Sequence, residues 1–310
     1  MKASLLLALL LATHSVSMAA TALPFRYSFE NTDLIYGADD RYEVNEYANP
    51  LFIEKARSVA LKVSARKLSE NREDPTLINF NTRKLKQVVP QICSDERFVD
   101  QVSLGDCSGF LISPNKLITA GHCITSEQEC LSNKWVFDFK ADTKVIKKSN
   151  VYSCKKVIAQ KYIYNKIQVN DFAVIELDRP VFGRAPLEYR KKGFVDHETP
   201  LVVIGHPLGL PMKITDGGRV AGLNNIEKET TFRSVFLRRN YFTANLDTFA
   251  GNSGSPVLNY ETGKVEGILI QGADDFIFNQ DRGCSESRHL SNDALNTYEK
   301  VMRINHVPGL

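Results

Sequence analysis

From Gln101 onward the chain alternates short apolar runs with turn residues. Runs such as SGFLIS, FAVIEL, PLVVIG and VEGILIQ are separated by stretches rich in Gly, Pro, Asn, Asp and Ser. Several short strands at such spacing, with few helical patterns between them, are typical of an all-β barrel or sandwich. Near the end, Leu295, Tyr298 and Met302 follow a candidate cap at Ser291 at helical spacing. This spacing predicts a C-terminal helix.

The segment before Gln101 is less regular. The pattern predicts a short helix over 50–56 and a strand over 59–65, and the polar stretch SENREDPTLINFNTRKLKQ indicates an exposed loop or linker. We therefore expect residues 21–100 to form an N-terminal segment, as a pro-segment, the first barrel strand or both. The main domain is expected over residues 101–310.

The first residues, MKASLLLALLLATHSVSMAATA, place one positive charge before a short apolar stretch and then small residues. The apolar stretch is too short to span a bilayer. This order predicts a secretory signal peptide over residues 1–20 and an exported, secreted or periplasmic protein. No later segment has enough consecutive apolar residues for a membrane helix, so we expect no membrane span.

Composition narrows the function classes. The 310 residues carry a formal net charge of only +3, without a basic stripe, so we expect no nucleic-acid partner. The chain has six cysteines. An even count in an exported chain favours disulfides, and no pair has the CxxC spacing of a zinc site. We therefore expect neither a metal nor a cofactor.

Two apolar runs flank SPNK within CSGFLISPNKLITAGHC, Cys107 to Cys123. A hairpin centred on Asn115 would place these two cysteines opposite each other, at a separation that a disulfide tolerates. Such a bridge would hold His122 at the end of a strand. A histidine beside a cysteine is usually structural. One that a disulfide holds at the end of a strand is a better candidate for a general base, so we single out His122.

A general-base histidine needs a carboxylate that fixes its tautomer. In NDFAVIEL, Asp171 opens an apolar run and enters the core with it, although alone it would be read as a turn or cap residue. In GNSGSPV, Ser253 stands between Gly251 and Gly254. The backbone N–H groups of Gly251 and Ser253 can form an oxyanion hole.

Alternative interpretations of this turn are weaker. Gly, Asn, Ser and Pro are also common turn residues, so the stretch alone could be structural. An α/β-hydrolase elbow requires G-x-S-x-G in a strand–turn–helix context and the order serine, acid, histidine. Position 255 is serine and the order here is His122, Asp171, Ser253, which excludes that fold.

With LITAGHC, NDFAVIEL and GNSGSPV in this order, the chain resembles the trypsin-like, chymotrypsin-fold serine peptidases over residues 100–285. IYGADDRYEV and VIGHPLGLP look most like the bacterial exported branch that includes the glutamyl endopeptidases. The resemblance implies an all-β fold of two six-stranded antiparallel barrels with the active site between them. It also implies a serine endopeptidase that acts through an acyl-enzyme on protein or peptide substrates.

The chain also departs from trypsin. Asn252 stands where trypsin has the acidic residue that pairs with its new N-terminus, so trypsin's route of activation is not expected. Of the cysteine pairs, only Cys107–Cys123 has a clear family counterpart. For the others we favour Cys130–Cys154 and Cys93–Cys284.

The resemblance gives conflicting indications of specificity. Asp247 lies at the offset where trypsin carries its specificity-pocket carboxylate, which favours cleavage after Lys or Arg, but a similar aspartate is structural in some glutamyl endopeptidases. Leu269, or Ile268 if a one-residue insertion is placed later, stands where those enzymes bind a substrate carboxylate through histidine. Neither can bind an anion, so a preference for Glu loses support. The substrate backbone is expected to pair near Ile270 to Gly272. The alternative function is a catalytically inactive trypsin-fold binding protein; in either case we expect a monomer.

Overall fold

The computed structural model describes residues 35–164, 169–222, 240–272, 274–292 and 299–310. The predicted signal peptide over 1–20 lies outside these residues. Among those described, no helix is long and apolar enough to cross a membrane.

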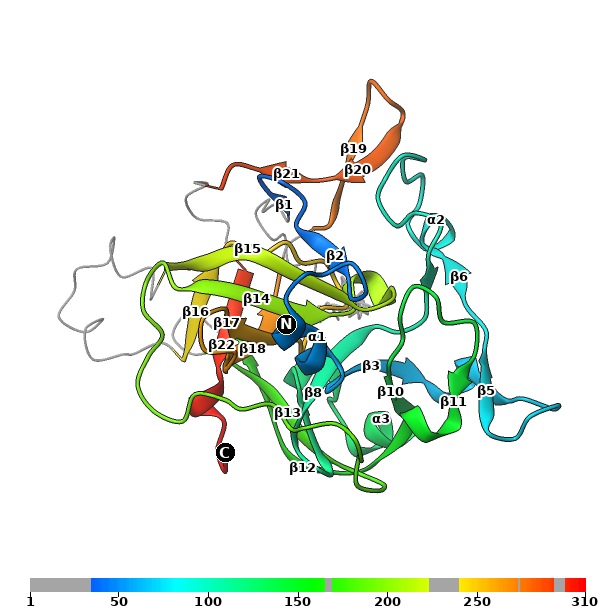
Figure 1. Ribbon diagram of the computed structural model, residues 1–310. Coiled ribbons are helices and arrows are strands. Elements are labelled where there is room, and N and C mark those ends of the chain that lie inside the picture. The colour runs from blue at the N-terminus through cyan, green and yellow to red at the C-terminus, as the bar shows by residue number, and fades with distance from the viewer. Residues whose placement is uncertain (1–34, 165–168, 223–239, 273, 293–298) are drawn as a thin grey trace, which may run out of the picture. The chain divides into compact units, whose positions relative to one another are not determined.

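Six antiparallel strands close the first barrel in the spatial order β10, β12, β13, β9, β8, β3 (Figure 1). Strand β13 has eight of its nine residues buried and pairs with β12 and β9 on its two sides. This burial explains its uninterrupted apolar run FAVI. The strands are β3 (Val59–Ser64), β8 (Cys107–Ser113), β9 (Lys116–Thr119), β10 (Asn133–Phe137), β12 (Val151–Tyr164) and β13 (Val169–Leu177).

The second barrel closes through a pairing between β14 and β15, and β2 is added at the edge of β15. Its strands are β14 (Pro200–Gly205), β15 (Lys213–Gly222), β16 (Tyr241–Ala244), β17 (Pro256–Asn259), β18 (Val265–Gln271) and β22 (Glu299–Arg303). The two barrels confirm the fold class predicted from the run pattern and the resemblance.

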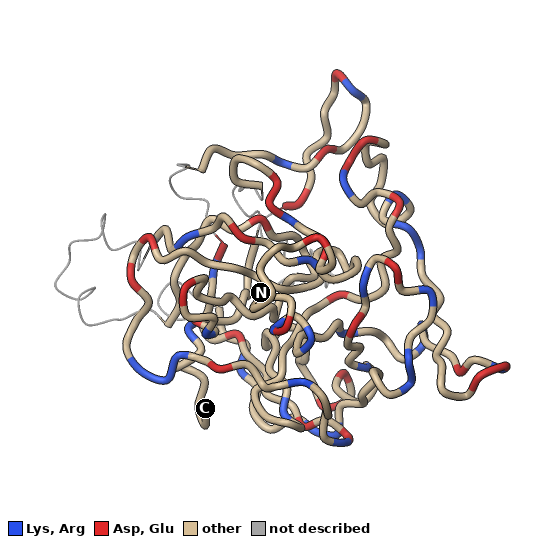
Figure 2. The backbone as a smooth tube through the Cα atoms, viewed as in Figure 1, with Lys and Arg blue, Asp and Glu red and all other residues tan. Residues whose placement is uncertain are grey.

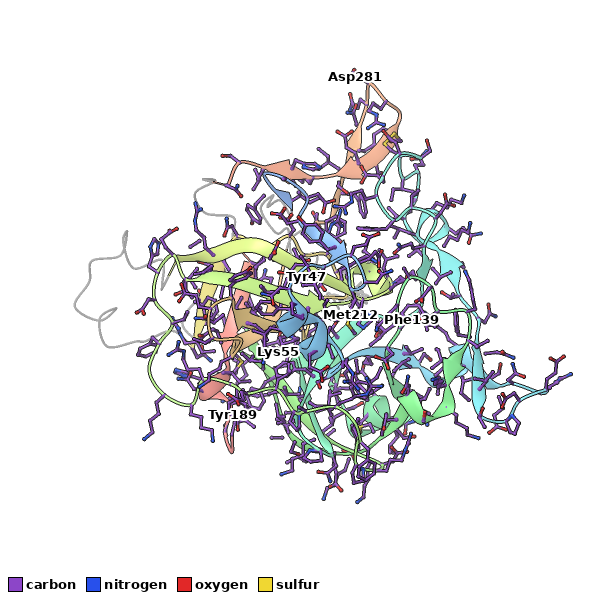
Figure 3. All side chains as sticks on the ribbon, viewed as in Figure 1. Tyr47, Lys55, Phe139, Tyr189, Met212 and Asp281 are labelled. Atoms are coloured by element: carbon purple, nitrogen blue, oxygen red, sulfur yellow. A yellow bond between two sulfur atoms is a disulfide. The ribbon has the colours of Figure 1, made fainter. Side chains whose placement is uncertain are left out.

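A shared apolar cluster joins the two barrels. It contains Phe110 and Phe172 from the first barrel and Ile204 and Ile268 from the second, all almost completely buried. Each such side chain contributes roughly 1.5–3 kcal/mol by leaving water. The backbone N–H of Met212 also donates to the carbonyl of Phe139 at 2.9 Å, and both residues are labelled in Figure 3.

The predicted C-terminal helix is wrong in its second half. Glu299–Arg303 form strand β22, which pairs with β16 on one side and β18 on the other. Val301 and Met302 are both buried, because successive side chains of a strand inside a closed barrel enter different apolar clusters. Residues 293–298, the first part of the predicted helix, lie outside the described residues.

The segment over 35–64 is part of the fold. Helix α1 (Pro50–Ala56) and strand β3 agree with the predicted helix and strand. Asn49 caps α1 by accepting the N–H of Leu51 at 3.0 Å. Strand β1 (Ile35–Tyr36) pairs with β21 (His289–Leu290), and β2 (Arg41–Glu43) pairs with β15.

The polar stretch after β3 is not a simple loop, which corrects the prediction. Between β3 and β8 the elements are η1 (Ala65–Lys67), β4 (Leu68–Glu70), β5 (Leu77–Phe80), β6 (Arg83–Lys84), α2 (Leu85–Val88) and β7 (Val102–Ser103). β5 pairs with β4 and with β11 (Ile146–Lys147), and Ile78 is buried against the first barrel. The sequence did not predict β5, because its short apolar run Leu77–Phe80 is flanked by polar and charged residues.

A hairpin of β19 (Phe276–Asn279) and β20 (Cys284–Ser287) projects from the second barrel, with Asp281 at its tip (Figures 1 and 3). Three disulfides are present: Cys93–Cys284, Cys107–Cys123 and Cys130–Cys154. These are the pairings that the sequence favoured. The other helical segments within the described ranges are α3 (Glu127–Ser132), η2 (Gly121–Cys123), η3 (Lys148–Asn150), η4 (Pro207–Gly209) and η6 (Ile304–His306).

Candidate active site

His122 lies in the single turn η2, directly after strand β9. The turn approaches the neighbouring strands so closely that a Cβ on Gly121 would lie 2.2 Å from the carbonyl oxygen of Lys161. Only glycine tolerates this approach. The side chain of His122 remains 30% exposed, so the imidazole reaches both the protein and solvent.

Asp171 holds His122 at two points. Its Oδ1 accepts the backbone N–H of His122 at 2.9 Å, and its Oδ2 lies 2.7 Å from Nδ1 of the same residue. Asp171 is 1% exposed. In the neutral imidazole this contact places the proton on Nδ1 and leaves Nε2 as an acceptor, which is the tautomer that a general base requires.

Ser253 lies in the turn between Gly251 and Gly254, both with positive φ (91° and 87°). A Cβ on Gly254 would lie 2.1 Å from the carbonyl oxygen of Ser108, so a larger residue cannot pack there. The carbonyl oxygen of Ser253 lies 3.8 Å from Sγ of Cys123. The turn therefore reaches the disulfide beside His122.

The backbone N–H groups of Gly251 and Ser253 have no acceptor among the described residues, whereas the turn's other amides do. Asn252 N–H donates to Phe249 at 3.0 Å, and Gly254 N–H donates to Leu269 at 2.7 Å. Two unused donors, separated by one residue on a rigid turn, can bind an oxyanion.

Ser108 joins the two barrels beneath this turn and was not singled out from the sequence. Its N–H donates to the carbonyl of Ser253 at 2.8 Å, and its hydroxyl donates to the carbonyl of Gly251 at 2.9 Å. The hydroxyl also accepts the N–H of His206 at 3.0 Å. The only signal in the sequence was a serine directly after Cys107.

His206 has a structural role, as the sequence indicated. It is fully buried and its Nδ1–H donates to the carbonyl of Leu210 at 2.9 Å. Burial lowers the pKa of His206 to about 3, so the ring stays neutral and keeps this hydrogen bond at physiological pH.

The Asp247 carboxylate is buried and contacts the β1–β2 segment. Its Oδ1 accepts the N–H of Tyr36 at 2.7 Å and its Oδ2 accepts the N–H of Asp40 at 3.0 Å. The residue is 4% exposed. Asp247 therefore holds the β1–β2 segment, and this arrangement does not support its predicted binding of a Lys or Arg side chain.

The other residues predicted to bind substrate lie on β18 or just after it. Leu269 is buried inside the second barrel, so its side chain does not reach a substrate. Ile270 is buried in the cluster between the barrels. Gly272 is exposed just after β18, where its backbone remains accessible.

Ligand atoms of Cys107, His122 and Cys123 lie within 4.8 Å of one another. The two sulfurs are bonded to each other, so neither is a thiolate that could bind a metal. This proximity reflects the disulfide that holds the histidine turn.

The Cys107–Cys123 bridge should matter for both stability and activity. The double variant Cys107→Ser/Cys123→Ser should lose about 3 kcal/mol of unfolding free energy, because a bridge over a short loop restricts the unfolded chain. It should also lower kcat/KM, because the bridge holds the turn of His122. Thermal unfolding and peptidase assays measure the two effects.

The Cys130–Cys154 bridge provides the matched control, since it joins α3 to β12 rather than to the histidine turn. Cys130→Ser/Cys154→Ser should lose comparable stability but keep its kcat/KM at temperatures where it is folded. Equal kcat/KM in the two double variants would contradict the positioning role.

Comparison with known proteins agrees with this fold. Residues 107–268 match the trypsin-like peptidase domain family. A Glu endopeptidase solved in complex with MPD has a similar structure, with a TM-score of 0.50, 17% identity, and coverage of 87% of this chain and 93% of its own. Vibrio cholerae VesB protease is similar with a TM-score of 0.51, 13% identity, and coverage of 88% and 64%.

A relative from Plasmopara viticola, secreted RxLR effector protein 73, is 27% identical over 200 residues. The match covers 63% of this chain and 44% of the relative, so the chain spans less than half of that protein. The family match covers more than half of this chain and includes the turn of His122, strand β13 with Asp171 and the turn of Ser253. The chain therefore belongs to the trypsin-like peptidase domain family.

Proposed function

We propose that the protein is an exported serine endopeptidase with His122, Asp171 and Ser253 as its catalytic triad and the N–H groups of Gly251 and Ser253 as its oxyanion hole. The observation that carries the proposal is the double contact of the buried Asp171 carboxylate with the backbone N–H and Nδ1 of His122. A structural aspartate would not need to orient an imidazole that is partly exposed.

In this mechanism the Oγ of Ser253 attacks the peptide carbonyl and transfers its proton to Nε2 of His122. The two backbone N–H groups stabilise the tetrahedral oxyanion, typically by about 10²–10³ in rate per donor. The protonated imidazole then donates its proton to the leaving amine, which departs and leaves an acyl-enzyme. Water, activated by His122 in turn, hydrolyses this ester.

We further propose that the mature enzyme retains the chain from β1 onward. β3 is a strand of the first barrel, β2 extends the second, and Cys93 is bonded to Cys284. Removal of residues up to 100 would open the first barrel. The three disulfides also favour an oxidising, exported location.

The second candidate is an inactive trypsin-fold binding protein. The similarity to a protein named as a secreted effector favours it, since an effector can act by binding alone. The unused amides and the oriented imidazole support the enzyme instead, because a binding protein has no need of either.

Covalent labelling with a fluorophosphonate separates these candidates. The folded wild type should be labelled, and Ser253→Ala should not be, because the probe requires an activated nucleophile. Ser132→Ala, which removes an exposed hydroxyl on α3, should be labelled like the wild type. Absence of labelling in a folded wild type would favour the binding protein, and labelling of Ser253→Ala would refute the assignment of the nucleophile.

A further inference from the structure

A cavity of about 480 Å³ lies next to the turn that carries the candidate oxyanion hole. Ala250, Gly251 and Leu208 line one side of it, and Lys67, Thr82 and Arg83 line the other. The second side comes from the insertion between β3 and β8, which the triad does not involve.

This second side is firmly attached to the second barrel. β6 pairs with β7, and the hydroxyl of Ser103 in β7 donates to the carbonyl of Leu208 at 2.6 Å. The N–H of Leu104 donates to the carbonyl of Gly209 at 2.8 Å. A Cβ on Gly209 would lie 2.1 Å from the carbonyl oxygen of Gly105, which shows how closely the two sides meet. The cavity wall is therefore ordered before any ligand binds.

The wall carries a net positive charge. Nζ of Lys67 donates to the carbonyl of Leu104 at 2.6 Å, which holds the ammonium group and leaves its other N–H groups available. The guanidinium of Arg83 makes no hydrogen bond or ion pair with any described residue. The one acidic residue of the lining, Asp106, lies 3.5 Å from Nζ of Lys62. The neighbouring Lys84 and Lys86 add little to this charge, because both pair with Asp100, at 3.2 and 2.7 Å. Basic residues of this part of the chain are blue in Figure 2.

The turn of Ser253 contacts strand β18 on its C-terminal side and the cavity on its N-terminal side. Strand β18 joins the turn at its far end, where the N–H of Gly254 donates to Leu269 and the N–H of Leu269 donates to Ser255. The cavity joins the turn at its near end, Ala250 and Gly251. A substrate whose acyl part follows β18, with its carbonyl between the two free amides, must continue toward the cavity after the cleaved bond.

We propose that this cavity binds the first residues after the scissile bond and favours Asp or Glu there, through Arg83 and Lys67. The inference rests on the proposed peptidase function. Each carboxylate contact at such a partly exposed site should favour acidic over neutral residues about two- to fivefold, as ion pairs near a surface do. The preference should weaken with added salt, because salt screens exposed charges.

Partitioning of the acyl-enzyme tests the cavity separately from the triad. A peptide ester has no residue after its scissile bond, so it forms the acyl-enzyme without using the cavity. An added dipeptide amide then competes with water: its amine attacks the acyl carbonyl, a new peptide bond forms, and the Oγ of Ser253 leaves. The ratio of peptide product to hydrolysed acid reports binding in the cavity. It is measured with Ala-Glu, Ala-Gln and Ala-Lys amides, and again with the dipeptides in which the two residues are exchanged.

Wild type should favour the glutamate amides over the glutamine amides in this ratio. Arg83→Gln should reduce the preference, and Arg83→Glu should shift it toward lysine. Arg72→Gln removes an exposed arginine elsewhere on the same insertion and should change nothing. Arg72→Gln should also keep the wild-type rate of ester hydrolysis.

The failures of the two proposals are distinguishable. Ester hydrolysis with no preference for the acidic amides, or an unchanged preference in Arg83→Glu, would overturn the assignment of the cavity while leaving the triad intact. A wild type that neither hydrolyses the ester nor reacts with a fluorophosphonate would overturn the proposed function, and this inference with it.

Discussion

Asp171→Asn should lower kcat/KM on peptide substrates by about 10⁴-fold while leaving a folded protein, as loss of the orienting carboxylate does in such triads. Asp171 accepts two hydrogen bonds from His122, one from the backbone N–H and one from Nδ1. Asparagine has only one acceptor oxygen. If that oxygen keeps the backbone N–H, the amide NH₂ faces Nδ1 and forces the imidazole proton onto Nε2, so the imidazole cannot act as a base.

The opposite orientation of the asparagine is also unfavourable. It would direct the NH₂ group at the backbone N–H of His122 and leave two donors facing each other in a buried site, at a cost of about 1–3 kcal/mol. Some loss of stability is thus expected, and thermal unfolding should accompany the kinetics so that only folded enzyme is compared.

Asp178→Asn is the matched control. Asp178 lies seven residues after Asp171, just beyond the end of β13. Its side chain is 37% exposed. Its change should leave kcat/KM within about twofold of wild type, since surface substitutions seldom matter. Near-normal activity of Asp171→Asn, or a comparable loss in Asp178→Asn, would remove Asp171 from the triad.

The sequence predicted the local parts of this site well. The turn of His122, the strand of Asp171 and the turn of Ser253 each depend on residues close in the chain, such as Gly121 and Gly254. Glycine signals where the backbone must come close to another strand, and the structure shows these approaches at both positions. The barrel strands were predictable for a similar reason, since each apolar run is short and is bounded by turn residues.

Non-local contacts explain what the sequence did not predict. Asp247 accepts the N–H of Tyr36, 211 positions away, so the spacing from Ser253 alone suggested a substrate pocket instead. β22 has apolar residues on both faces because it lies between two strands, and periodicity cannot separate such a strand from a buried helix. Arg83 faces its cavity only because β6 pairs with β7, and these strands are too short to give a periodic pattern.

Asp247 also gives rise to a pH effect on stability. Burial raises the pKa of Asp247 to about 7, because desolvation outweighs the two backbone N–H donors that stabilise its charged form. Between pH 4 and 7 the folded protein therefore keeps a proton that the unfolded chain releases. By linkage, the free energy of unfolding falls as pH rises through this window, by about 4 kcal/mol for a rise of roughly three pKa units.

Comparison of wild type with Asp247→Asn isolates this contribution from the other carboxylates. Burial also raises the pKa of Asp275 to about 7, whereas the pKa of Asp39 is lowered by its hydrogen bonds and charge interactions with Arg41, which outweigh desolvation. Asparagine at position 247 cannot ionise. The variant should therefore gain stability relative to wild type as pH rises from 4 to 8, by about the same 4 kcal/mol.

Urea unfolding at pH 4, 6 and 8 measures the difference directly. At pH 4 the wild-type Asp247 is protonated and does not pay the cost of burying a charge. Asp247→Asn has one acceptor fewer for the backbone N–H groups of Tyr36 and Asp40. The variant should therefore be less stable than wild type at this pH. The disadvantage should shrink or reverse by pH 8. Asp281→Asn, at the exposed tip of the β19–β20 hairpin, should follow wild type at every pH. Parallel curves for wild type and Asp247→Asn would mean that Asp247 is ionised in the folded protein throughout this range, and that its two backbone donors outweigh its burial.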